Sequence, residues 1–314
     1  MTLNWMQRYA ATEMVERSDA GLMDRREALG HLGRILGSAA GAAAFLAACS
    51  SDNAPPKVGP PRTSVPSVPV PVPPTNGGAG HVLSVSVDDP DLRTEDVKFA
   101  GPASPILGYL ARPAARGRYP GVLVIHEIFG LNDHIRDVAR RLAKVGLIAI
   151  APDLASRAGG TDAADDVVSA LISGPVEAPV ADMNAAVDYL EGLAAFNGRL
   201  GVTGFCFGGG MTLAFAAAQP KVAAGVAYYG PTPEPASVMS ETNAAILAHY
   251  GADDARVNAG IAALETALAG KTFTQHTWPG VGHQFNNDTS PAYDESVAVD
   301  AWTETLAWFA KYLR

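Results

Sequence analysis

The 314-residue chain contains only two cysteines, Cys49 and Cys206. Small secreted proteins that depend on disulfides carry many more for their length, so we exclude that class. The sequence also has no P-loop, no dinucleotide-binding glycine fingerprint and no basic cluster interleaved with aromatic residues. These absences argue against nucleotides and nucleic acids as ligands.

Metal ligands are equally scarce in the sequence. His126 and His134 lie close together, but no cluster of cysteines, histidines and carboxylates with metal-ligand spacing accompanies them. We therefore predict no metal and no cofactor, and ordinary polar roles for both histidines.

A short pattern around Cys206 is the most informative feature that is present. Gly204-Phe205-Cys206-Phe207-Gly208 is the motif G-x-S-x-G with cysteine in place of serine. A nucleophile at a sharp strand-to-helix turn needs residues without bulk two positions to either side. The flanks fit, because 200–203 reads as an apolar strand and 209–218 as a small-residue helix. We predict that Cys206 is a nucleophile; the alternative is a buried structural cysteine.

A base for this nucleophile can be sought by chain order. In α/β-hydrolases the nucleophile comes first, the acid second and the histidine last. Three histidines follow Cys206, and two of them, His249 and His276, lie within predicted strands. His283 instead lies in a flexible loop just after a strand, so we predict that it is the base. Between nucleophile and base the only aspartates are Asp253 and Asp254, one to orient the imidazole and one solvated.

From about residue 97 to 314 the sequence resembles the dienelactone hydrolase family, the cysteine-nucleophile branch of the α/β-hydrolases. The resemblance implies an ester or lactone hydrolase with a Cys-His-Asp triad, and it favours Asp254 over Asp253. Its motifs follow one another in the family's order: Gly108 to Pro113, His126 to Asn132, Ala151 to Leu154, Gly204 to Gly209, Tyr250 to Val257, and Gly282 to Phe285.

Glu127 follows the apolar run 122–125 and is a further candidate. Burial there would raise its pKa and demand a hydrogen-bond donor, whereas the alternative is a surface carboxylate. The family resemblance implies that Glu127 pairs with the resting thiol and moves when substrate binds. We predict an oxyanion hole from the backbone N–H groups of Ile128 and Phe207, and the helix that starts there favours a thiolate.

The N-terminal region has a different character. Arg25-Arg26 precedes an uncharged stretch, 35–51, that is rich in alanine and glycine, which indicates a twin-arginine export signal over 1–48. Leu46 to Cys49 resembles a lipobox, with cleavage before Cys49 and a lipid on its sulfur. The alternatives are an uncleaved membrane anchor, for which 17 residues are few, and a soluble periplasmic or secreted form. The acidic stretch before Met23 is atypical of a signal, so translation could begin at Met1 or Met23.

Two further regions complete the predicted organisation. Residues 49–80 are rich in proline, which predicts a disordered linker that holds a lipid-anchored domain away from a bacterial membrane. Residues 81–314 have the size of one domain, and alternating strands and helices after Gly121 predict the mostly parallel, helix-flanked sheet of an α/β-hydrolase, as a monomer. Strands are expected at 83–87, 96–99, 106–111, 121–125, 147–151, 200–203, 222–228, 245–250 and 272–278, and helices at 133–145, 162–172, 180–193, 211–218, 258–268 and 297–313.

We predict a thiol hydrolase of a small-molecule ester or lactone; the alternative is a non-catalytic surface lipoprotein that uses the fold to bind. Family members that accept an anionic lactone carry an arginine four residues after the histidine, where this chain has Asn287. That departure predicts a preference for neutral substrates, with Arg157 as the one plausible contact for an anion. The alternative for Arg157 is a solvated loop position.

Overall fold

The computed structural model describes residues 3–49 and 83–314, so the predicted linker lies outside the described residues except for its first position. One sheet of eight strands runs through residues 92–278, in the order β1-β2-β4-β3-β5-β6-β7-β8. β1 and β2 pair antiparallel, β2 also pairs antiparallel with β4, and the remaining neighbours are parallel. The strands are β1 Leu92–Phe99, β2 Ile106–Pro113, β3 Tyr119–Ile125, β4 Ile148–Pro152, β5 Phe196–Phe205, β6 Val222–Tyr228, β7 Ala245–Gly251 and β8 Phe273–Trp278.

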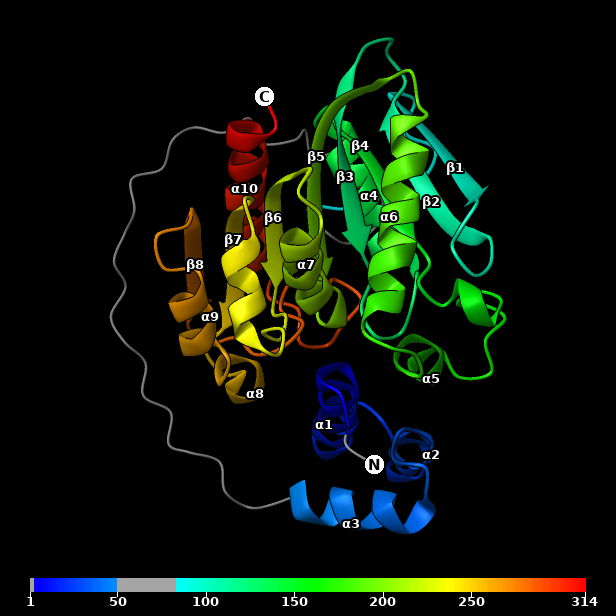
Figure 1. The fold of residues 1–314 in the computed structure, drawn as a ribbon, viewed down its shortest axis with the longest axis vertical. Coiled ribbons are helices and arrows are strands. Elements are labelled where there is room, and N and C mark those ends of the chain that lie inside the picture. Colours follow the sequence, from blue (N-terminus) through cyan, green and yellow to red (C-terminus); the bar gives the residue numbers. More distant parts are fainter. Residues whose placement is uncertain (1–2, 50–82) are drawn as a thin grey trace.

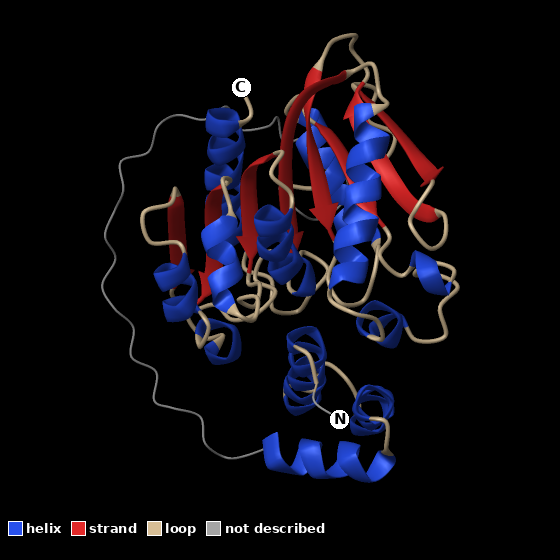
Figure 2. Cartoon of the chain, in the orientation of Figure 1, coloured by secondary structure: helices blue, strands red, loops and turns tan. Residues whose placement is uncertain are grey.

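Helices cover both faces of this sheet (Figure 2). In Figure 1, α6, α7 and α9 lie in front of the strands and α4 and α10 behind them. The central strands are apolar over consecutive residues, and 121–125 is buried throughout, as expected of a parallel sheet covered on both sides. The helices of this part are α4 Asp133–Lys144, α5 Val167–Ile172, α6 Glu177–Glu191, α7 Phe207–Ala218, α8 Ala255–Asn258, α9 Ile261–Ala267 and α10 Glu295–Tyr312, with short 3-10 turns η1 Ser156–Ala158 and η2 Ala236–Glu241.

The predicted α/β-hydrolase fold is therefore confirmed, but the first predicted strand, 83–87, is wrong. That segment has no regular secondary structure. Its backbone bonds go to side chains of α4 instead: the Val85 N–H donates to Asp137 at 2.8 Å, and Arg140 Nε donates to the Val85 carbonyl at 2.6 Å. The segment is thus pinned to a helix rather than added to the sheet.

Three further helices precede the sheet and its covering helices: α1 Trp5–Asp19, α2 Arg25–Leu36 and α3 Ala39–Cys49. Local signals account for their ends. Asn4 and Gln7 form a capping box at the start of α1, Asp24 caps α2, and Gly37 ends α2 in the left-handed conformation at φ 70°. These helices lie below the carboxyl ends of the parallel strands (Figure 1), and α1 buries much of its length.

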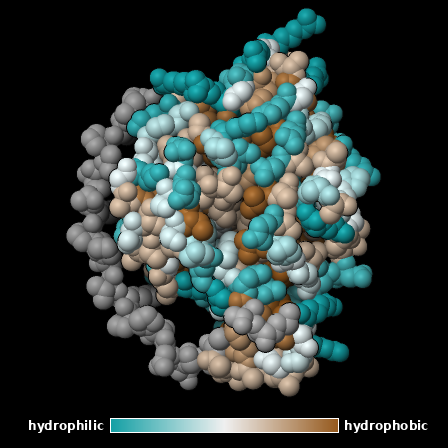
Figure 3. Space-filling view, in the orientation of Figure 1, coloured by the Kyte–Doolittle hydropathy of each residue, from teal (hydrophilic) through white to brown (hydrophobic). Residues whose placement is uncertain are grey.

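The second and third helices bear on the predicted anchor. Among the described residues no single helix has the length and apolar character to cross a membrane. α2 and α3 together would meet both criteria, but the chain bends by 115° between them. Figure 3 shows the alanine-rich α3 as a weakly hydrophobic strip at the foot of the molecule.

Candidate active site

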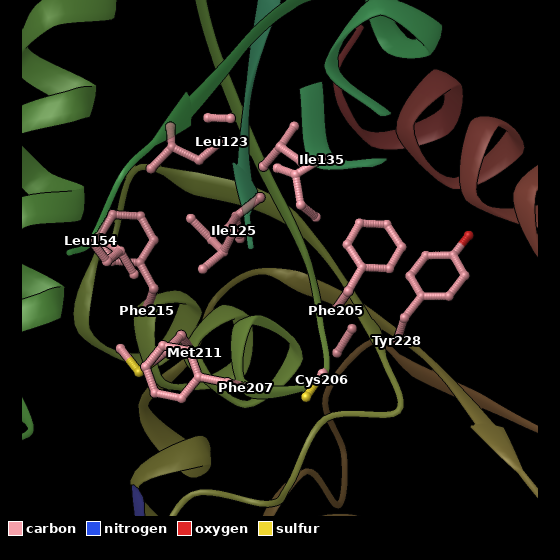
Figure 4. Close-up of a cluster of buried hydrophobic side chains, with 14 of the residues drawn as sticks. Leu123, Ile125, Ile135, Leu154, Phe205, Cys206, Phe207, Met211, Phe215 and Tyr228 are labelled. Carbon is pink, nitrogen blue, oxygen red and sulfur yellow. The ribbon is translucent and has the colours of Figure 1, made fainter. Parts of the chain in front are cut away.

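Cys206 stands at the turn between β5 and α7, at the carboxyl edge of the sheet. Its backbone has φ 58° and ψ −122°, a conformation that non-glycine residues rarely adopt. Gly204 and Gly208 make the turn possible, because a Cβ on Gly204 would overlap the Gly208 carbonyl and one on Gly208 would overlap the Ile125 carbonyl. Figure 4 shows Phe205 and Phe207 on opposite sides of the turn, with the Cys206 sulfur at the lower edge of the side chains drawn. The local fold therefore presents this side chain at the edge where the other strands end.

His283 and Asp254 come together beside this cysteine. The Nδ1–H of His283 donates to Asp254 Oδ2 at 2.5 Å, and a ring nitrogen of His283 lies within 4.8 Å of the Cys206 sulfur. Burial opposes a charged imidazole, but the carboxylates of Asp254 and Glu13 raise the pKa of His283 well above its ordinary value. Burial likewise opposes the Asp254 carboxylate, and the imidazole beside it holds the pKa of Asp254 below its ordinary value.

Asp254 is placed by the helix that it starts. It is the N-cap of α8, and its carboxylate accepts a hydrogen bond from the Val257 N–H at 3.2 Å. Asp253 is held differently, with its own backbone N–H donating to the Val281 carbonyl at 3.0 Å. Of the two aspartates in this loop, Asp254 is the one that the structure brings to His283.

The histidine loop is fixed to α4, although the sequence predicts that it is flexible. Its residue Asp288 accepts hydrogen bonds from His134 Nδ1 at 2.8 Å and from Arg141 at 2.5 Å, and Arg141 also pairs with Asp137. Burial opposes a charged Asp288, but these donors lower its pKa. His134 packs edge-on against Phe205, the last residue of β5, so the network joins the loop that carries His283 to the strand that precedes Cys206.

The two remaining candidate histidines lie in strands. His249 on β7 is fully buried, accepts a hydrogen bond from Trp278 Nε1 at 3.3 Å, and has its pKa lowered by burial to about 3. His276 on β8 pairs with Glu304 of α10 at 3.3 Å. Both have packing partners away from Cys206, as expected for strand histidines.

Glu127 follows β3 and is buried, which rules out the alternative of a surface carboxylate. Its Oε2 accepts hydrogen bonds from Asn287 Nδ2 at 2.8 Å and from Gln284 Nε2 at 3.4 Å, while Oε1 has no partner among the described residues. Burial raises its pKa. No hydrogen bond joins it to Cys206 in the described part of the chain, so the family pairing is not seen in this conformation.

The predicted oxyanion donors lie at two neighbouring turns. Phe207 is the first residue of α7, so its N–H is among those that have no intrahelical acceptor, and Ile128 comes directly after Glu127. His126 braces the second turn. Its Nδ1–H donates to the Glu127 carbonyl at 2.6 Å and its Nε2 accepts from the Leu154 N–H at 3.0 Å. Both ring nitrogens are therefore used structurally.

Arg157 lies on η1, and its guanidinium is engaged elsewhere. Nε and Nη2 donate to the two oxygens of Asp182 on α6 at 2.9 and 2.7 Å. Such a two-point pair holds the planar group firmly. The structure therefore does not bring Arg157 into contact with Cys206, His283 or Asp254.

Helix α1 supplies site residues that the sequence analysis missed. The Tyr9 hydroxyl lies 3.0 Å from the Cys206 sulfur and 3.3 Å from His283 Nε2, and Glu13 lies 3.6 Å from the same nitrogen. With α1 in this position Cys206 is 0 % exposed. A prediction that removes 1–48 as a signal cannot place these side chains. The one available indication was the acidic stretch before Met23, which is unusual for a signal.

Comparison with known proteins settles the family. Residues 106–313 match the Dienelactone hydrolase family. The chain belongs to this family of hydrolases. A protein of Methylorubrum extorquens named "Putative carboxymethylenebutenolidase" is 37% identical over 246 residues, which are 73% of this chain and 84% of that protein. One from a Bradyrhizobium species, named "Probable 2-oxo-3-(5-oxofuran-2-ylidene)propanoate lactonase", is 34% identical over 66% of this chain and 90% of its own length.

A solved structure agrees with these relatives. The crystal structure of a "Putative Dienelactone Hydrolase" from Klebsiella pneumoniae superposes with a TM-score of 0.66 at 34% identity, covering 70% of this chain and 99% of the Klebsiella chain. The structural match thus spans nearly the whole of the Klebsiella chain and the part of the present chain that contains the sheet.

Proposed function

We propose that this dienelactone hydrolase family member cleaves an ester or lactone through an acyl-enzyme on Cys206. The observation that carries the proposal is the convergence of Cys206, His283 and Asp254 at one edge of the sheet, with Asp254 hydrogen-bonded to the base at 2.5 Å. That arrangement has the roles of a nucleophile, a base and a group that orients the base. The names of the relatives support the substrate class.

The proposed reaction has two halves. Cys206 Sγ attacks the carbonyl carbon while His283 holds the thiol proton, and the oxygen of the tetrahedral intermediate lies against the N–H groups of Ile128 and Phe207. The C–O bond breaks, the alcohol leaves with the proton from His283, and a thioester remains. Water then attacks the thioester carbonyl while His283 takes a proton from it, the C–S bond breaks, the carboxylic acid leaves, and His283 returns the proton to the Cys206 sulfur. Asp254 keeps the imidazole oriented throughout.

Glu127 completes the proposed acid–base set. Burial raises the pKa of Glu127, and two amides rather than an arginine donate hydrogen bonds to its carboxylate. The family resemblance assigns the equivalent carboxylate to the control of thiolate formation. We assign Glu127 that role here, reached by a movement from its position beside Asn287.

The acyl-enzyme can be detected directly. Because α1 covers Cys206, we would use the full chain with Met6→Asp, which places a charge on a fully buried position of α1 and undocks it. Exposure to an activated acetate ester should add one acetyl group to the peptide that contains Cys206, detected by mass spectrometry. The same chain with Cys206→Ala serves as the control. If Cys206 of the Met6→Asp chain reacts with a thiol reagent but forms no acyl adduct, the result would contradict the hydrolase proposal and favour the alternative of a non-catalytic binding protein.

We also propose export to the cell envelope with a lipid on Cys49. Arg25 and Arg26 are exposed at the start of α2, where export machinery can reach them. Changing both to lysine should leave the precursor in the cytoplasm, since the twin-arginine pathway reads the arginine pair. Cys49→Ser should block lipidation or release a soluble form. Cell fractionation and mass measurement would decide, and a native protein in the soluble cytoplasmic fraction beginning at Met1 or Met23 would contradict both steps.

A further inference from the structure

Helix α1 is docked across the active site by contacts on several sides. Its inner face is apolar and buried, including Met6, Ala10 and Met14. Its polar residues reach four separate segments around the site: Gln7 donates to the Ile172 carbonyl of α5 at 3.3 Å, Arg8 pairs with Glu234 after β6, Arg17 donates to Gln284 of the histidine loop at 3.1 Å, and Glu13 pairs with Arg256 of the acid loop. The helix is therefore fitted to this site and does not merely lie near it.

The Tyr9 hydroxyl fills the space in which chemistry has to occur. It lies 3.0 Å from the nucleophilic sulfur and 3.3 Å from the nitrogen of the base. A substrate must place its carbonyl carbon and its leaving oxygen at about the same distances from these two atoms. Substrate and Tyr9 cannot both be present, so the docked state of α1 excludes the reaction.

Glu13 and Arg256 form the second half of this contact. A Glu13 carboxylate oxygen, the Cys206 sulfur and a His283 nitrogen all lie within 4.8 Å of one another. Arg256 pairs with Glu13 and, through Nε at 2.6 Å, with Glu16, and its guanidinium stacks on the Tyr9 ring at 4.5 Å from the centroid. Every hydrogen bond of the Arg256 side chain within the described residues goes to α1, and one of its terminal nitrogens is buried without a partner.

We propose that α1 is an internal mimic of the substrate, and that Arg256 is the residue that recognises an acid group at this site. In the full chain α1 occupies the site and keeps the enzyme latent. Once α1 leaves, Arg256 binds the carboxylate of an anionic ester or lactone that Glu13 had imitated. The inference rests on the proposed thiol hydrolysis, and it replaces Arg157 with Arg256 as the contact for an anion.

Release follows from the way in which α1 is attached. A covalently linked segment competes for a site at an effective concentration that a free peptide does not reach. An isolated helix of 15 residues is also only marginally stable in water. The proposed cut before Cys49 would separate all of α1 from the catalytic domain, so processing of the export signal would also activate the enzyme.

Latency can be tested on the full chain with matched variants. Met6→Asp inserts a charge into the buried face of α1, whereas Gly30→Asp adds the same charge at an exposed position of α2. We expect Met6→Asp to raise kcat/KM for ester hydrolysis by about 100-fold, the increase that corresponds to an undocked population of about one per cent in the parent chain, and Gly30→Asp to leave it unchanged. Equal activity of parent and Met6→Asp would overturn the latency proposal.

A second readout separates latency from catalysis. Iodoacetamide alkylation of Cys206, located by peptide mass spectrometry, needs an accessible thiol but no hydrolysis. It should be at least about 100-fold faster in Met6→Asp than in the parent or Gly30→Asp. Faster alkylation of Met6→Asp without ester turnover would support the proposal that docked α1 blocks Cys206, but it would refute the hydrolase function. Ester turnover that is equal in all three chains would support the hydrolase function but overturn the latency proposal.

The role of Arg256 is tested in the Met6→Asp background with a neutral ester and its carboxylate-bearing isostere. Arg256→Gln should lower kcat/KM for the anionic substrate about 10 to 100-fold more than for the neutral one, the usual effect of losing a hydrogen bond to a charged group. Arg256→Lys should recover part of the difference. Equal losses for the two substrates would show that Arg256 only supports the nearby Asp254, and would overturn its assignment to substrate recognition.

Discussion

In the Met6→Asp chain, in which α1 is undocked, Cys206→Ala is expected to lower the rate of ester hydrolysis by about 10⁴-fold or more. The acyl-enzyme cannot form without the sulfur, so that only substrate binding and the oxyanion donors still contribute to the rate. The substitution removes a sulfur at the sheet edge, so the melting temperature should change little compared with the activity. Steady-state kinetics with an activated ester, in the Met6→Asp chain, measure the effect.

The second cysteine provides the matched control for this result. Cys49→Ala removes the other thiol of the sequence, and in the purified Met6→Asp chain it should leave the rate of ester hydrolysis unchanged. Cys206→Ala activity within tenfold of the parent would transfer the chemistry to another group and end the triad assignment.

Asp254→Asn should produce the next largest loss, on the order of 10³ to 10⁴-fold in kcat, as in hydrolases whose orienting aspartate becomes an amide. Two effects combine. The NH2 group of the asparagine can donate to Nδ1 and so favours the wrong tautomer of His283, and the loss of the Asp254 charge removes the largest of the influences that raise the pKa of the imidazole. Kinetics across pH would show both the lower rate and a downward shift of the limb that reports His283.

Asp253→Asn is the matched control one residue earlier. It changes the same chemical group within the same loop but leaves the contact to His283 intact, so its effect should be far smaller. A larger loss for Asp253→Asn than for Asp254→Asn would mean that the loop rearranges and that Asp253 orients the base.

Much of the site could be predicted because its determinants are local. The glycines around Cys206 describe one tight turn, and the order of strands places His283 and an aspartate after neighbouring strands of the sheet. A choice between Asp253 and Asp254 required the family pattern, since residues alone do not say which of two adjacent carboxylates begins α8.

Other features depended on contacts between distant segments. The pattern of 83–87 suits a strand, but side chains of Asp137 and Arg140 take its backbone bonds. Glu127 was expected to be buried, but its hydrogen-bond donor Asn287 was not foreseen. In the sequence, Asn287 was interpreted only as the position at which other family members carry an arginine. The contact of Tyr9 with Cys206 spans 197 positions of sequence, and nothing in either local pattern announces it.

The fit of Gly204 and Gly208 in the turn around Cys206 affects how mutational screens of this protein should be read. Neither residue has a side chain to offer to a substrate, yet an added methyl group at either position would collide with backbone carbonyls. Variants at both positions would therefore score as inactive beside Cys206 in a screen that selects for turnover. Only a parallel measure of folded protein abundance would separate the two glycines, which shape the turn, from the cysteine, whose loss we expect to leave a well-folded but inactive protein.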